Sequence, residues 1–160
     1  MGCLDILLPI VLGEAEIRVL SPASATAVRV GFILKTFKLT KTNEYFAMSV
    51  PGLNGEPLQF AHGRARTLSM VLAFDGRATN TDVRQPMAQV RALMNVDRDR
   101  HAPPLLAVEW QGESFQCVLA SAVEEFRSVF TDGRPSRGRM RVVFRESRSL
   151  AQLQQEANLQ

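Results

Sequence analysis

The two histidines of this sequence, His62 and His101, are the side chains best suited to proton transfer or metal binding near neutral pH. Neither belongs to a Cys/His cluster with the spacing of a zinc site. The serines lack the Gly-x-Ser-x-Gly pattern of a nucleophile elbow, and no glycine pattern matches a phosphate-binding or dinucleotide-binding loop. We therefore expect no catalytic residue, no cofactor-binding residue and no metal site, and we expect that the chain is not an enzyme.

The cysteines and the N-terminal stretch bear on where the chain is made. Cys3 and Cys117 are far apart and form no CxxC motif, so they predict no disulfide framework and favour a reducing cytoplasm. The apolar stretch at residues 1–12 lacks the positive region of a signal peptide, is interrupted by Asp5 and Pro9, and is too short to span a bilayer. We interpret it as an N-terminal strand or a partner-docking arm, and we predict synthesis and assembly in the cytoplasm without membrane insertion.

Arginine dominates the cations of the chain and is unevenly distributed. Of the 19 Lys and Arg residues, 16 are Arg, and six of these fall between residues 134 and 148. A guanidinium group pairs well with carboxylates and phosphates. The run is therefore either a strand face that meets solvent or a partner protein, or a nucleic-acid-binding surface. We favour the first interpretation, because no DNA-binding or RNA-binding motif accompanies the run.

Apolar and polar residues alternate around these arginines, which predicts that the arginines lie on strands. In the segment Arg137–Glu146, the side chains of Met140, Val142 and Phe144 should face a core, and the arginines between them should face away from it. Arg66–Phe74 alternates in the same way and is the clearest strand of the chain. Further strands are predicted at Glu16–Leu20, Val28–Thr42, Pro104–Trp110, Phe115–Ala122 and Val123–Phe130.

Breaks in these patterns predict turns and one helix. A slip near Lys35 and Thr36 indicates a bulge or a turn, and Gly-containing turns are expected at residues 111–113 and 131–135. The segment Asn43–Gly63 loses periodicity and reads as a long functional loop. An apolar stripe predicts a helix over Val83–Met94, with a capping box formed by Asp82 and Gln85.

The length and composition fit one soluble domain, and we assign residues 1–148 to it and residues 149–160 to a polar, helix-prone tail. The patterns together predict a mainly β fold, an antiparallel β-sandwich or β-barrel flanked by one α-helix.

The order of motifs resembles the tube-type baseplate proteins of contractile injection systems. The likeness covers roughly residues 28–148, with one departure: the family has Trp followed directly by Gly where this chain has Trp110-Gln111-Gly112. The segments that carry the resemblance are a strand ending in Phe-Asp at 63–75, the helix start at 82–84, a His-x-Pro-Pro strand at 101–112, the turn at 130–137 and the end of the final strand at 143–146.

The resemblance implies a phage tail-tube fold whose subunits join into a hexameric ring between the central spike and the inner tube of a phage-tail-like particle. The implied partners are further copies of the chain, the spike protein, the inner tube protein and other baseplate proteins. Many members continue into a LysM module, and this sequence stops at Gln160, where such a module would begin. A role that depends on LysM anchoring is therefore not implied.

Two function classes remain open beside this adaptor role: the stacked inner tube protein itself, and a nucleic-acid-binding β-barrel that uses the C-terminal arginines. For the assembly role we expect the long loop to clasp a neighbouring subunit, and we expect the outward arginines to meet acidic groups such as Glu124 and Glu125 of an adjacent strand or chain. The candidate interface residues are Asn54, Gly55, Glu56, Arg137, Arg139, Arg141 and Arg145.

Overall fold

The computed structural model describes residues 12–22 and 25–159. The segment 1–11, for which we expected a strand or a docking arm, lies outside these residues. The elements of the described residues are β1 (Leu12–Ser21), β2 (Ala27–Ile33), the 3-10 turn η1 (Leu34–Thr36), β3 (Lys38–Thr40), β4 (Asn43–Ala47), β5 (Leu58–Gly63), β6 (Thr67–Asp75), α1 (Arg84–Ala92), β7 (Leu105–Trp110), β8 (Glu113–Val129), β9 (Pro135–Glu146) and α2 (Leu150–Asn158).

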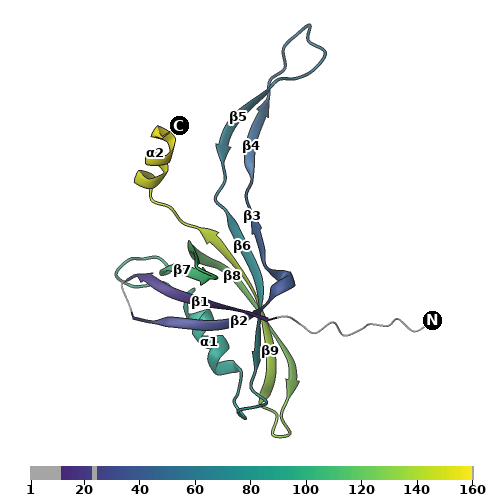
Figure 1. Cartoon of the computed structure of the whole chain (residues 1–160), viewed down its shortest axis with the longest axis vertical. Helices are drawn as coiled ribbons and strands as arrows, with labels where there is room; N and C mark the ends of the chain where they lie inside the picture. Colours follow the sequence, from purple (N-terminus) through teal and green to yellow (C-terminus); the bar gives the residue numbers. More distant parts are fainter. Residues whose placement is uncertain (1–11, 23–24, 160) are drawn as a thin grey trace, which may run out of the picture.

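The main sheet is antiparallel and has the strand order β2-β1-β7-β8-β9-β6-β3. β6 also pairs with β2, where Gly31 lies opposite Ala73 and Phe32 lies opposite Leu72. This pairing closes β2, β1, β7, β8, β9 and β6 into a barrel, and β3 continues along β6 beyond η1. Figure 1 shows the barrel as the body of the molecule. The predicted antiparallel, mainly β fold is therefore confirmed. Closure of the sheet also removes most of its free edges.

The core of the barrel comes from alternation in β6 and β9. Leu72 lies opposite Met140, and Leu68 lies opposite Phe144, and all four side chains are buried. Each such side chain stabilises the fold by about 1.5–3 kcal/mol through removal of apolar surface from water. The predicted inward and outward faces of these two strands are therefore confirmed.

The helix α1 completes the core, and Figure 1 shows it against the lower part of the barrel. Its Met87 and Val90 are buried, as are Val83 before it and Leu93 after it. The predicted capping box is wrong. Asp82 accepts a hydrogen bond from the backbone N–H of Arg84 at 2.9 Å and pairs with the guanidinium of the same residue, so its carboxylate is already occupied by a local turn. A capping box does occur in the tail helix α2, between Ser149 and Gln152.

Two strand predictions need correction. Phe115–Ala122 and Val123–Phe130 are not separate strands, because β8 runs continuously through both. Its register on β9 shifts between Leu119 and Ser121, and such a bulge inserts a residue that interrupts the alternation without ending the strand. The long strand predicted over Val28–Thr42 is divided by η1, where the Thr36 hydroxyl donates to the carbonyl of Ile33 at 2.6 Å and accepts from the N–H of Val71 at 2.9 Å. The slip at this point is therefore a turn.

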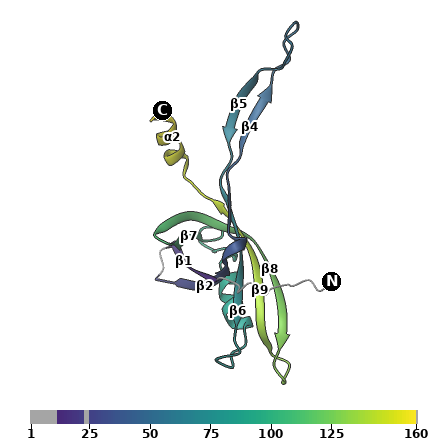
Figure 2. The same cartoon turned by 45° about the vertical axis from the view of Figure 1, so that its right-hand side comes forward.

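The segment Asn43–Gly63 is not a structureless loop. β4 and β5 pair as a two-stranded antiparallel hairpin, which we call the arm (residues 43–63). Figures 1 and 2 show the arm projecting far beyond the barrel. Sequence periodicity missed it because almost all of its side chains are exposed, so no core selects an apolar position at every second residue.

Candidate assembly interface

The tip of the arm carries three of the residues predicted to meet a neighbour. Asn54, Gly55 and Glu56 are exposed, and a Cβ atom added at Gly55 would meet no atom within 4 Å. The tip is held by the N–H of Met48, which donates to the carbonyl of Pro57 at 2.9 Å. The three residues therefore lie at the far end of a closed hairpin, where only another molecule can reach them.

The flanks of the arm expose more apolar surface than its sequence suggested. Phe46 is 65% exposed and Leu58 is 68% exposed, and they lie next to the ring pair Tyr45–Phe60, whose centroids are 5.6 Å apart. Exposed apolar side chains gathered on one projection are typical of protein–protein contact sites. We did not predict these residues, and the aromatic and aliphatic content of residues 45–60 was the available signal.

Ion pairs fix the base of the arm. Glu44 pairs with Arg64 and with His62, whose Nε2 lies 3.1 Å from the Glu44 carboxylate. The Lys41 ammonium donates to the carbonyl of Arg64 at 2.7 Å. His62 therefore lies on the surface of the arm, in contact with Glu44.

The predicted arginines lie together on the outer face of β9. We call Arg137, Arg139, Arg141 and Arg145 the arginine face. Within the described chain none of them forms an ion pair, and the one hydrogen bond among them runs from Arg137 Nε to the Ser128 hydroxyl at 2.9 Å. Asp75 and Glu125 lie opposite Arg137 and Arg139, but their ion pairs are with Arg77 and Arg127. The strand face therefore keeps an excess of positive charge.

Of the two acidic residues expected beside the arginines, Glu125 lies there and Glu124 does not. Glu124 lies opposite Met140 on the inner side of β8 and forms an ion pair with Arg91 of α1 at 2.8 Å. Glu125 does lie opposite Arg139 on the outer side, but its ion pair is with Arg127 at 3.3 Å. Glu124 therefore cannot be the acidic partner of the arginine face within its own chain.

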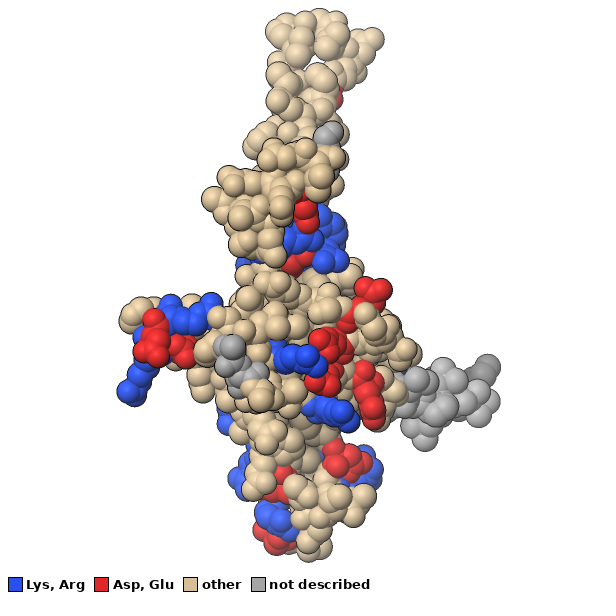
Figure 3. Space-filling view, turned by 60° about the vertical axis from the view of Figure 1, so that its left-hand side comes forward, with Lys and Arg blue, Asp and Glu red and all other residues tan. Residues whose placement is uncertain are grey.

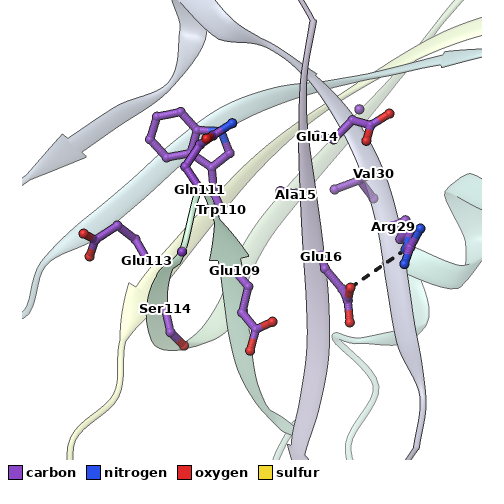
Figure 4. Close-up of a pocket in the computed structure, with 12 residues that line it drawn as sticks. Glu14, Ala15, Glu16, Arg29, Val30, Glu109, Trp110, Gln111, Glu113 and Ser114 are labelled. Atoms are coloured by element: carbon purple, nitrogen blue, oxygen red, sulfur yellow. Dashed lines mark ion pairs between the residues drawn. The ribbon is translucent and has the colours of Figure 1, made fainter.

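A second charged surface lies on another wall of the barrel. Glu14 and Glu16 of β1, Glu109 of β7 and Glu113 of β8 line a hollow of about 690 Å³, which we call the acidic groove. Figure 4 shows Glu16 and Glu109 side by side in it, and Figure 3 shows acidic side chains gathered on this side of the barrel. Arg29 and Arg18 partly neutralise the groove through ion pairs with Glu16 and Glu109.

Sequence reasoning missed the acidic groove. The alternation of Glu14, Glu16 and Arg18 with Ala15 and Ile17 was a signal for an outward charged strand face. Glu109 lies opposite Glu16 on the neighbouring strand, and this contact depends on pairing between segments that are distant in the sequence.

Trp110 and Cys117 have packing roles. The Trp110 ring lies 4.6 Å from that of Phe37, measured between centroids, and 6.0 Å from that of Phe32. Burial raises the pKa of the Cys117 thiol to about 12, so the thiol is not a nucleophile near neutral pH.

The described residues contain no group of three or more His, Cys, Asp or Glu side chains that could hold a metal ion. Among the helices of the same residues, none has the length and apolar character needed to cross a membrane.

Comparison with known proteins agrees with this architecture. The sequence profile of the contractile injection system tube protein family matches residues 21–155. A solved structure with a similar fold is that of the Dit protein of phage SPP1, described as a paradigm of the hub adsorption apparatus in phages that infect Gram-positive bacteria. The TM-score is 0.50 at 12% identity, and the match covers 83% of this chain and 49% of the Dit chain, so this chain spans about half the length of that protein. No curated protein sequence matches this chain significantly.

The profile match covers most of the chain and includes every element of the barrel except the greater part of β1. The matching family is one of structural components of a phage-tail-like particle. The chain therefore belongs to the contractile injection system tube protein family.

Proposed function

We propose that this chain forms a hexameric ring that joins the central spike to the inner tube in the baseplate of a contractile injection system. The observation that carries the proposal is the arm, which projects from a closed barrel and exposes apolar side chains at its flanks. A solitary domain gains nothing from such a projection, whereas a ring subunit can lay it on a neighbour and bury the exposed surface.

The partners proposed for the ring are the spike protein on one side and the inner tube protein and other baseplate proteins on the other. The ring would assemble in the cytoplasm of the producing cell before the particle is used. The family match supports a place in the tube or baseplate. The two ends of the barrel differ, since one carries the arm and α2 and the other carries the turn between β8 and β9, which is the asymmetry that an adaptor with two unlike partners requires.

A second candidate within the same particle is the stacked inner tube protein, and the name of the matching family favours it. The two roles differ in what the ring contacts. A tube protein stacks on identical rings, whereas an adaptor forms a single ring and presents unlike faces to the spike and the tube.

Electron microscopy of the purified chain, alone and with the spike and tube proteins of the same particle, tests both roles. We expect closed rings with six-fold symmetry that stay single and that bind one spike. Long stacked tubes from the chain alone would support the tube protein instead. Monomers under all of these conditions would contradict both.

Deletion of Asn54, Gly55 and Glu56 tests the arm within this function. We expect ring formation to fall while the circular dichroism spectrum stays unchanged, because the tip makes no contact with the barrel. A length-preserving variant, Asn54→Ser with Glu56→Gln, is the control that separates reach from side-chain chemistry. Normal rings from the deletion variant would remove the tip from the interface.

A further inference from the structure

The arginine face forms no ion pair within the described chain, so it can bind an anionic surface. Arg139 and Arg141 project from the same side of β9, about 7 Å apart along the strand. Arg141 lies between two apolar cross-strand neighbours, Val71 and Val123, of which Val123 is 55% exposed. Arg139 lies between Ala73 and Glu125, and the ion pair of Glu125 is with Arg127. Like charges at this spacing repel each other, so their accumulation beside apolar residues indicates a surface that is covered by carboxylates in the assembled state.

The acidic groove contains more carboxylates than its own arginines neutralise. Glu16 and Glu109 share the guanidinium groups of Arg18 and Arg29. Glu14 and Glu113 have no cationic partner within the described chain and are exposed. The groove thus keeps an excess of negative charge after its internal pairs are made. Because it is hollow, long cationic side chains can enter it.

The two surfaces lie on different walls of one barrel. In the closed order β2-β1-β7-β8-β9-β6, β9 is three strands away from β1 in either direction. Glu14 and Glu16 project from the same side of β1 and are separated by two residues, as Arg139 and Arg141 are on β9. Equal spacing along two extended strands allows both cations to meet both carboxylates at once.

We propose that the arginine face of one copy docks into the acidic groove of the next copy, forming the head-to-tail interface around the ring. This inference rests on the proposed function, since it names the subunit contact of that ring. Complementary surfaces on two walls of the same subunit form a heterologous interface, which produces a closed ring when the rotation between copies closes. Opposed charges at such an interface fix the register of the two strands.

A second copy of the chain fits better than a nucleic acid. A phosphate backbone would occupy the arginine face and leave the excess carboxylates of Glu14 and Glu113 unused. Docking between copies uses both surfaces and brings the apolar Val71 and Val123 into the contact.

Charge reversal on each surface tests the docking. One variant carries Arg139→Glu and Arg141→Glu, and another carries Glu14→Lys and Glu113→Lys, positions whose reversal breaks no ion pair of the described chain. Sedimentation velocity should show that each variant alone needs a concentration higher by at least about tenfold for half-assembly. An equal mixture of the two variants should assemble nearly as the wild type does, because every interface in an alternating ring then pairs opposite charges. A single chain with all four changes should also assemble.

The control variant carries Lys35→Glu and Arg98→Glu, two exposed cations outside both surfaces, and matches the arginine-face variant in net charge. It should assemble normally, and circular dichroism should show that all variants are folded.

If wild-type rings form and both reversal variants assemble like the wild type, the docking is wrong and the ring stands. The docking is also overturned if the variants fail alone but the mixture and the four-fold variant do not recover. A wild type that stays monomeric overturns the ring and the docking together. Loss of double-stranded DNA binding by R139E/R141E with unchanged assembly would assign the arginine face to nucleic acid instead.

Discussion

At the scale of single residues, Glu146 joins three segments of the chain. Its carboxylate accepts hydrogen bonds from the Arg66 guanidinium at 2.8 Å, from the Arg66 backbone N–H at 3.0 Å and from Arg148 at 2.8 Å. Arg148 also donates to Glu156 of α2 at 2.6 Å. Glu146 thus ties the start of β6 and the end of β9 to the tail helix.

The surroundings of Glu146 have opposite effects on its ionisation. Burial by itself raises the pKa, but the hydrogen bonds from Arg66 and Arg148 outweigh burial and lower the pKa to about 2. A carboxyl group whose pKa is lower in the folded chain than in the unfolded chain stabilises the fold above the unfolded value of 4.5. This stability is lost as the pH falls from that value toward 2.

We therefore predict that Glu146→Gln lowers the free energy of unfolding by about 1–2 kcal/mol at pH 7, because water screens the arginines that reach the surface. The difference from the wild type should shrink below pH 4.5 and disappear near pH 2. Urea denaturation across this pH range measures it. Glu156→Gln is the matched control, since this exposed partner should cost at most about 0.5 kcal/mol. A pH-independent difference would show that shape, not charge, explains the effect.

At the scale of elements, Gly76 sets the connection between β6 and α1. Its N–H donates to the carbonyl of Ser136 at 2.8 Å, and its own carbonyl accepts from the N–H of Thr81 at 3.0 Å. A Cβ atom at this position would collide with the backbone carbonyl of Thr81. Backbone atoms cannot move aside as a flexible side chain can, so the helix would have to shift.

We predict that Gly76→Ala lowers the free energy of unfolding by about 1–3 kcal/mol through this overpacking. Denaturant titration measures the change. Gly55→Ala is the matched control, because a Cβ atom there would enter open space. Equal stabilities of the two variants would mean that the connection relaxes without cost.

The exposed apolar side chains of the arm do not stabilise the monomer. We predict that Phe46→Thr with Leu58→Thr changes the free energy of unfolding by no more than about 0.5 kcal/mol, because both side chains are already in water. The same variant should lose ring formation in electron microscopy, since the apolar contact with a neighbour is gone. Val96→Thr changes a side chain that is 62% exposed and lies outside the arm, so it should assemble normally. Rings from the double variant would exclude the flanks of the arm from the interface.

At the scale of the whole molecule, the formal net charge of +3 conceals two surfaces of opposite sign on different walls of the barrel. Attraction between exposed charges is screened over about 10 Å at 0.1 M salt and about 3 Å at 1 M. Apolar contacts of the arm are not screened in this way.

We predict that raising the salt concentration from about 0.05 M to about 0.5 M shifts wild-type rings toward smaller species in sedimentation velocity, because screening weakens the charged contact. The four-fold charge-swapped variant should show the same dependence, since it restores opposed charges with the signs exchanged. Assembly that strengthens with salt would indicate that apolar burial dominates the contact.

The sequence by itself determined the parts of this protein in which burial imposes a period. The inward residues of β6 and β9 and the apolar stripe of α1 were predictable, because a core accepts apolar side chains only at every second position of a strand or along one face of a helix. The turn at Gln111 and Gly112 was also predictable, and both residues have the positive φ values that a two-residue hairpin turn requires.

The tertiary structure alone decided the features that depend on pairing between distant segments. Closure of the barrel through β2 and β6, the arm with its two exposed faces, and the meeting of Glu16 with Glu109 leave no local period in the sequence. Neighbouring residues of a strand point to opposite faces, so the bulges in β8 decided that Glu124 meets α1 while Glu125 stays beside the arginine face. The arginine run was therefore visible in the sequence, but its acidic counterpart became visible only when β1 and β7 lay side by side.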